Sequence, residues 1–146
     1  GQTRWLYQCM SPQGNGLNRF IRIPLMPTRL SHWINYRYHT TGFLHWGLNY
    51  WAGAKNEDPW EDAGGDYPAG DMWIIWPGYH KVYPSIRLAA MRDGIRDYEL
   101  LRMLEVRSSS DADALCRRIV TDQYNYTTDV KTFRAERKKL LELLSI

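Results

Sequence analysis

Short apolar segments that alternate with amphipathic helical segments constrain the fold of this chain more than any other feature of its sequence. Residues 5–9, 43–46 and 72–76 are rich in the aromatic and apolar side chains that favour strands, and Pro77-Gly78 stops the third. The second segment lacks polar alternation, which suits a strand buried on both faces, as in parallel sheets. Strands of this kind with helices between them predict βαβ units in an α/β fold.

Four helices are predicted from capping residues and from apolar side chains at three- and four-residue spacing. Thr28 can cap the first helix and Ser85 the second. Asp111 can cap the third, and Asp129 or Thr128 the fourth. The apolar side chains that mark them are Leu30, Ile34 and Tyr38 in the first, Leu88, Met91, Ile95, Tyr98, Leu101 and Leu104 in the second, Leu115, Ile119 and Val120 in the third, and Val130, Phe133, Leu140, Leu141 and Leu144 in the fourth.

The composition indicates one compact folded unit and excludes two classes of partner. The chain has 146 residues, of which 44% are hydrophobic and 24% charged, as in ordinary folded proteins. Its net charge of +3 is not concentrated in a basic run of the kind that nucleic-acid binding needs. Its apolar runs are far shorter than the roughly 20 residues of a membrane helix. We therefore expect no nucleic-acid partner and no membrane span.

No metal site and no cofactor are predicted. Cys9 and Cys116 lie far apart in the sequence, so they form no C-x-x-C ligand pair. The four histidines form neither an H-x-x-x-H nor an H-E-x-x-H pattern. We expect the thiols to be free and the imidazoles to be structural or surface groups.

Aromatic side chains are the outlier in the composition. The chain has seven Trp and ten Tyr, and some of these are needed for the core. The flat faces of tryptophans also stack on the apolar faces of sugar rings, while the indole N–H can bond sugar hydroxyls. Residues 47–71 form a long irregular loop, and loops of that length are usually functional or disordered.

Several motifs together resemble one protein family. The longest is Arg-Asp-Gly-Ile-Arg-Asp-Tyr-Glu-Leu-Leu at residues 92–101, which is quite specific. The chain is similar, over nearly its whole length, to the C-terminal part of the catalytic region of glycoside hydrolase family 123, also called domain of unknown function 4091. The other motifs that carry the resemblance are Arg29-x-x-x-Trp33, Gly42-Phe43-Leu44-His45-Trp46-Gly47-x-Asn49-x-Trp51, Gly70-Asp71, Trp76-Pro77-Gly78 and Pro84-Ser85-Ile86-Arg87-Leu88.

The resemblance implies a (β/α)8 TIM-type barrel and a retaining β-N-acetylgalactosaminidase activity on a glycan or glycolipid. In such a substrate-assisted reaction the acetamido oxygen of the sugar attacks the anomeric carbon, and an adjacent Asp-Glu pair of the protein assists. This chain contains no Asp-Glu dipeptide, and Glu57-Asp58 and Glu61-Asp62 have the reverse order. The pair is therefore expected upstream, so no catalytic residue is assigned here. The chain departs from the family pattern at Met72, Trp76 and Arg96.

The fold class expected from the resemblance is the C-terminal part of an α/β barrel, about three strands with flanking helices. Residues 1–105 would form its final βα units, and residues 106–146 a helical extension packed on the barrel. Three strands cannot close an eight-stranded barrel. The upstream part of the same barrel is therefore an expected partner, and an isolated fragment would expose strand edges and self-associate. The parent is expected to be secreted or periplasmic.

Candidate substrate-binding residues follow from the ends of the predicted strands, where barrel enzymes gather their functional groups. Trp46 would be a stacking wall for the N-acetyl sugar, or else a side chain that fills the barrel interior. Asn49 would bond sugar hydroxyls and Trp51 would line a neighbouring subsite. The alternatives are a turn-forming Asn and a Trp that anchors the loop.

Three further candidates are Asp71 and Trp76, which flank the last predicted strand, and Tyr7, which lies within the first. Asp71 would accept a sugar hydroxyl, or else cap the loop. Trp76 would add to the sugar pocket, and Tyr7 would point into the barrel with its hydroxyl near the substrate. A buried tyrosine with a satisfied hydroxyl is the alternative for Tyr7.

Two functions from different classes remain open from the sequence. The first is a segment of a hydrolase that releases N-acetylgalactosamine from glycans or glycolipids. The second is a non-catalytic carbohydrate-binding protein that keeps the aromatic side chains on the same fold. An Asp-Glu pair in the sequence upstream of Gly1 would favour the enzyme.

Overall fold

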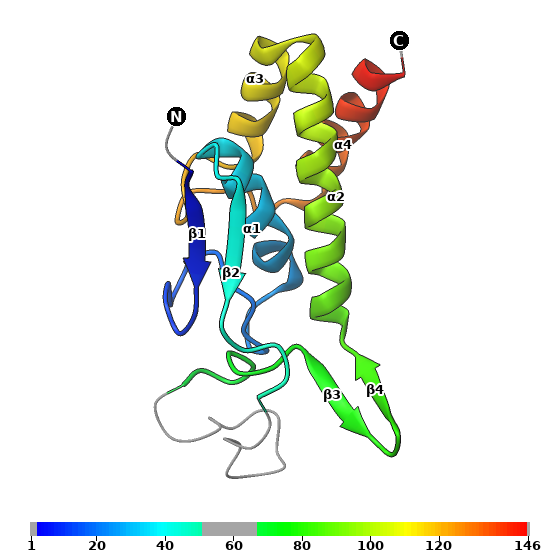
Figure 1. The fold of residues 1–146 in the computed structure, drawn as a ribbon. Coiled ribbons are helices and arrows are strands. Elements are labelled where there is room, and N and C mark those ends of the chain that lie inside the picture. Colours follow the sequence, from blue (N-terminus) through cyan, green and yellow to red (C-terminus); the bar gives the residue numbers. More distant parts are fainter. Residues whose placement is uncertain (1–2, 51–66, 146) are drawn as a thin grey trace.

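The fold is mixed α/β, with four helices and four short strands in the part of the chain that the structure describes (Figure 1). The structure is a computed structural model, and it describes residues 3–50 and 67–145. No helix within these ranges is long and apolar enough to cross a membrane.

Two parallel strands and the helix between them form a βαβ unit, as the sequence predicts. Strand β1 (Trp5–Gln8) pairs with β2 (Gly42–His45), with Trp5 opposite Gly42 and Gln8 opposite His45. Helix α1 (Leu25–Arg37) connects them and lies against one face of the pair (Figure 1). Pro27 is tolerated in its first turn because a proline there costs no helical hydrogen bond.

The two faces of this sheet differ in burial. On the helix side, Gln8 is buried and its amide donates to the carbonyl of Leu17 at 2.9 Å and to the hydroxyl of Ser31 on α1 at 3.3 Å. On the opposite side, which we call the open face, Trp5, Tyr7 and Leu44 are 64%, 50% and 50% exposed. Alternation along each strand places these three side chains together. An apolar sheet face therefore has no cover within the described residues.

The prediction of a third parallel strand at residues 72–76 is wrong. Met72, Trp73 and Ile74 are buried but not in a named strand, and β3 (Ile75–Gly78) forms an antiparallel hairpin with β4 (Lys81–Pro84). The apolar run correctly indicated burial, but burial does not fix strand direction. Pro77-Gly78 continues β3 instead of ending it, because a strand of a two-stranded ribbon has a free side where proline needs no partner.

Two of the four helices are capped by a predicted residue, and two are not. Helix α2 (Ile86–Arg107) is capped by Ser85, and α4 (Val130–Leu144) by Asp129, as predicted. Helix α3 (Ser109–Ile119) is capped by Ser108 and not by Asp111, which lies in its first turn. Helix α1 begins three residues before the predicted cap; the Thr28 hydroxyl instead donates to the carbonyl of Asn18.

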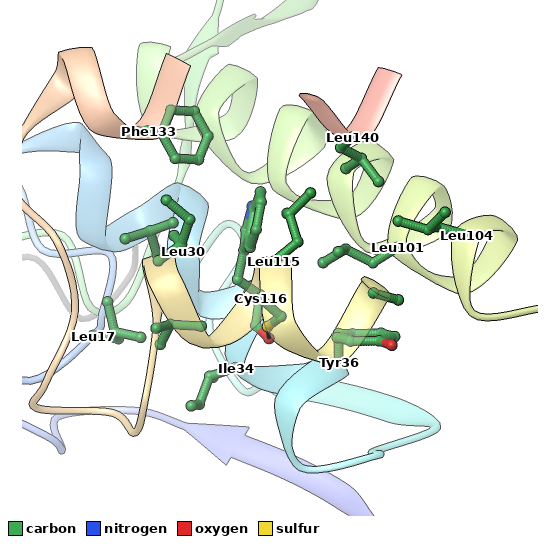
Figure 2. Packing of buried hydrophobic residues seen from close by; sticks show 14 residues of the cluster. Leu17, Leu30, Ile34, Tyr36, Leu101, Leu104, Leu115, Cys116, Phe133 and Leu140 are labelled. Atoms are coloured by element: carbon green, nitrogen blue, oxygen red, sulfur yellow. Dashed lines mark hydrogen bonds between the residues drawn. The ribbon is translucent and has the colours of Figure 1, made fainter. Parts of the chain in front are cut away.

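All four helices contribute to one core (Figure 2). Helices α1 and α2 approach closely at Gly94, where a Cβ atom would lie 2.3 Å from the carbonyl oxygen of Arg29. Glycine is thus required at this crossing. The fully buried aliphatic and aromatic side chains of the core are Leu17, Leu30, Trp33, Ile34, Leu101, Ala112, Leu115 and Leu140, with Tyr36, Leu104, Ile119, Val120 and Phe133 nearly so.

Candidate functional site

A buried carboxylate gathers side chains at the carboxyl ends of β1 and β2. Asp71 is 0% exposed, and its Oδ2 accepts a hydrogen bond of 2.9 Å from the indole N–H of Trp46, the residue that follows β2. Its Oδ1 lies 3.2 Å from Nε2 of His45, the last residue of β2. Asp71 therefore fixes the orientation of the Trp46 ring.

The proton on His45 can be assigned from its partners. Its Nδ1 accepts hydrogen bonds from the backbone N–H of Gly47 at 3.1 Å and from the guanidinium of Arg19. Nδ1 is therefore unprotonated, so Nε2 carries the hydrogen and donates it to Asp71. Burial lowers the pKa of His45, and the positive charge of Arg19 lowers it further against the opposing hydrogen bond to Asp71. The imidazole is neutral and holds Asp71 as a second N–H donor.

Two buried arginines fix the loops around this carboxylate. The guanidinium of Arg19 donates to the carbonyls of Gly47 and Asp71, the latter at 3.2 Å. The guanidinium of Arg87, on α2, donates to the carbonyls of Arg19, Gly70 and Trp73 at 2.7–2.9 Å. Burial lowers the pKa of Arg19 to about 9 and that of Arg87 to about 10, so both remain charged at neutral pH. The loops that carry the site are thus tied together by charge-assisted bonds.

Exposed aromatic rings surround Trp46. Its ring centroid lies 5.7 Å from that of Tyr50 and 5.4 Å from that of Tyr67. Trp46 and Tyr67 are each 37% exposed and Tyr50 is 50% exposed. The pKa of Tyr7 is raised, chiefly by partial removal from water and by Cys9, with smaller effects of Asp71 and Tyr67. Tyr7 lies near the carboxyl end of β1, opposite Leu44 of β2, at the same end of the sheet as Trp46. We call Tyr7, Trp46, Tyr50 and Tyr67 the aromatic wall.

The structure brings together some of the predicted site residues and separates others. Tyr7, Trp46 and Asp71 meet at the ends of the two parallel strands. Asn49 is exposed, and its backbone bridges to Trp73 in the buried segment before β3. Trp76 lies in the hairpin and packs on Trp73, with ring centroids 5.7 Å apart. Trp51 lies outside the described residues, as do both Glu-Asp pairs.

The sequence predicts no site role for five residues of the site, which are Arg19, His45, Tyr50, Tyr67 and Arg87. His45 lies in one of the motifs that carry the resemblance and Arg19 lies in none, but only a structure shows that both contact Asp71. Tyr50 and Tyr67 both lie within the long loop predicted at residues 47–71, and sequence spacing cannot predict that both contact Trp46. The high tyrosine content of the chain is the one sequence feature that points to them.

A second buried histidine, outside the site, makes folding sensitive to acid. His32 on α1 is 4% exposed, its Nδ1 accepts from Asn35 at 3.1 Å, and burial lowers its pKa from 6.5 to about 4. Between these two pH values the unfolded chain binds a proton that the folded chain does not, so stability rises with pH there. The full stability is therefore present above about pH 6.5, and the part that depends on a neutral His32 is lost as the pH falls from there through about 4.

We expect the free energy of unfolding to be roughly 2 kcal/mol smaller at about pH 4.5 than at about pH 7 because of His32. Urea titrations at both pH values measure this difference, and His45 acts in the same direction. His32→Gln, which cannot take the proton, should reduce the pH dependence. An unchanged slope in that variant would contradict the assignment.

Comparison with known proteins now places the chain among the glycoside hydrolases. A family model described as the catalytic domain of glycoside hydrolase 123 matches residues 1–104. The chain belongs to glycoside hydrolase family 123. No match was found among curated proteins.

A solved structure agrees in fold with most of the chain. It is a family 123 glycoside hydrolase from Clostridium perfringens, studied for glycolipid glycan hydrolysis, with a TM-score of 0.62 and 18% identity. The alignment covers 95% of this chain and 26% of that chain. The present chain thus spans about a quarter of the length of that enzyme.

Proposed function

We propose that this chain is the C-terminal part of a TIM-type barrel and supplies part of a sugar-binding site. The parallel pair β1–β2 with α1 between its strands supports this reading. So does the open face, because the remaining strands of a closed barrel would cover it. Residues 1–105 then form the last βα units, and residues 106–146 an extension whose helices α3 and α4 pack on α1 and α2.

The observation that carries the sugar site is the fixed, half-open ring of Trp46. Its N–H is held by the buried Asp71, so the ring face stays directed while Tyr50 and Tyr67 flank it. A directed aromatic face offers stacking to the apolar face of a sugar without the entropy cost of ordering the ring on binding. The tyrosine hydroxyls can exchange hydrogen bonds with sugar hydroxyls.

The substrate class that we propose is a β-linked N-acetylgalactosaminide on a glycan or glycolipid. In the substrate-assisted reaction, the acetamido oxygen attacks the anomeric carbon and the glycosidic oxygen leaves with a proton from a general acid. A rigid aromatic wall beside the acetamido group would exclude water and strengthen charge interactions at the reacting centre. Both carboxylate oxygens of Asp71 are already engaged, so its proposed part is to hold Trp46 and not to transfer protons. The Asp-Glu pair would come from upstream.

Replacement of Trp46 in the full-length parent tests this function. We expect Trp46→Ala to lower kcat/KM on a chromogenic β-N-acetylgalactosaminide about 100-fold, because stacking and the closed shape are both lost. Trp46→Phe keeps a ring and should lose less. Tyr79→Ala, at the exposed turn of the hairpin, is the comparison for loss of an aromatic side chain away from the aromatic wall.

The two candidate functions give different results in this assay. Turnover by the parent, reduced in Trp46→Ala, supports the hydrolase. Sugar binding without turnover of any hexosaminide would instead make the parent a carbohydrate-binding protein. Turnover that is unaffected by Trp46→Ala would refute the role of the aromatic wall.

A further inference from the structure

A positively charged groove lies outside the aromatic wall, between the N-terminal halves of α1, α2 and α4. It encloses about 1060 Å³. Its charged lining consists of Arg29, Arg92, Asp93, Arg96, Arg134 and Arg137. Volumes of this order are typical of clefts that bind discrete ligands.

The carboxylates at the groove do not balance its arginines. Asp97, buried beneath it, binds Arg29 and Arg137 at 2.7 and 2.8 Å. Asp93 lies 3.1 Å from Arg92 and 3.7 Å from Arg96, and both of these guanidiniums remain more than half exposed. Five arginines therefore face two carboxylates, which leaves an excess of three positive charges.

One arginine of the groove, Arg134, has no carboxylate partner within the part of the chain that the structure describes. Arg134 lies exposed on α4, one turn before Arg137, and no ion pair joins it to a described acidic residue. Asp129 at the start of the same helix is engaged by the backbone N–H groups of Lys131 and Thr132. The guanidiniums of Arg134, Arg92 and Arg96 thus remain available to an anion.

Apolar side chains complete the groove. Leu25, Ile86 and Val130 line it and are 40%, 71% and 45% exposed. The lining therefore combines planar N–H donors, which bind carboxylate and sulfate oxygens in pairs, with apolar patches on which ring faces can lie. We propose that the groove binds an acidic oligosaccharide, a glycan segment that carries carboxylate or sulfate groups.

A glycan fits this surface better than a membrane does. The arginines line a groove of about 1060 Å³ between three helices, whereas the basic side chains that bind anionic lipids typically cluster on an amphipathic helix or next to a membrane span. The inference deepens the proposed function, because an acidic segment held here would belong to the glycan on which the parent acts. Its own test measures binding and does not depend on hydrolysis.

Isothermal titration of the chain with a sulfated heparin tetrasaccharide tests the proposal, with neutral chitotetraose as the comparison ligand. We expect binding of the sulfated ligand only, weakened by added salt because the charges are exposed. The double variant Arg96→Gln/Arg134→Gln should raise the Kd at least about tenfold. The matched variant Lys138→Gln/Lys139→Gln removes the same charge from α4 outside the groove and should change the Kd less than about twofold.

Three results would overturn the proposal. They are the absence of sulfated-ligand binding by a folded chain, equal weakening in the two double variants, and arginine-dependent binding to phosphatidylserine vesicles without binding to the oligosaccharide. A parent that hydrolyses no hexosaminide would refute the proposed function but leave this titration unaffected. Single variants Arg96→Gln and Arg134→Gln, checked for folding by circular dichroism, replace the double variant if it does not fold.

Discussion

Asp97→Asn should destabilise the chain by about 3–5 kcal/mol, because two arginines would lose the charge that compensates them. The carboxylate is 0% exposed and accepts four hydrogen bonds, two from Arg29, one from Arg137 and one from the indole of Trp33. The amide of Asn offers one oxygen in place of two and turns an N–H₂ group toward these donors. In a chain of this size the melting temperature should fall by roughly 10 °C.

Asp93→Asn is the matched control, since Asp93 lies one turn away on α2 and also pairs with two arginines. Those pairs are exposed to water, and exposed ion pairs contribute about 0–1 kcal/mol. Thermal unfolding followed by circular dichroism compares the two variants. Equal losses would show that burial of Asp97 does not determine its contribution.

Asp71→Asn should release the ring of Trp46 and destabilise the rim of the site. One of the two N–H donors, on Trp46 or His45, would then face an amide instead of a carboxylate oxygen. Arg19 would also lose the negative charge that partly offsets its burial beside Arg87. Hydrogen bonds to charged groups contribute about 1.5–3 kcal/mol each, so we expect a loss of about 3 kcal/mol in urea unfolding.

Hydrogen exchange measures separately whether the Trp46 ring is released from Asp71. The indole N–H signal of Trp46, assigned by its disappearance in Trp46→Phe, should exchange with solvent at least about tenfold faster in Asp71→Asn. Trp46→Phe removes only one hydrogen bond to Asp71 and should destabilise the chain less than Asp71→Asn does. Unchanged exchange of the indole N–H would refute the holding role of Asp71.

The elements that the sequence predicts correctly are those specified by local pattern. The spacing of Leu30 and Ile34 marks α1, and Ser85 and Asp129 cap their helices through hydrogen bonds within one turn. The hairpin β3–β4 was missed because its two connecting residues, Tyr79 and His80, lack the usual Asn-Gly or Asp-Gly signal. Only the second of the two, His80, has a positive φ, at 55°, whereas the turn formed by Asn-Gly requires a positive φ at both residues.

The site was predicted in part, for a similar reason. Trp46 and Tyr7 follow from strand ends, which topology brings together. Asp71 was singled out, but its sequence neighbours do not show that it is buried or that His45 and Trp46 share it. Buried polar contacts between segments 25 or more residues apart depend on the whole fold, so no local pattern encodes them.

The main core of the described residues is built mostly by the four helices, and neither two-stranded sheet contributes a fully buried side chain to it. The helical core and the aromatic wall therefore lie in separate layers of the chain. Substitutions at the strand ends can change which ligand fits while the helical layer keeps its packing. Such an arrangement would allow related enzymes to diverge in preference without first acquiring compensating changes in their interiors.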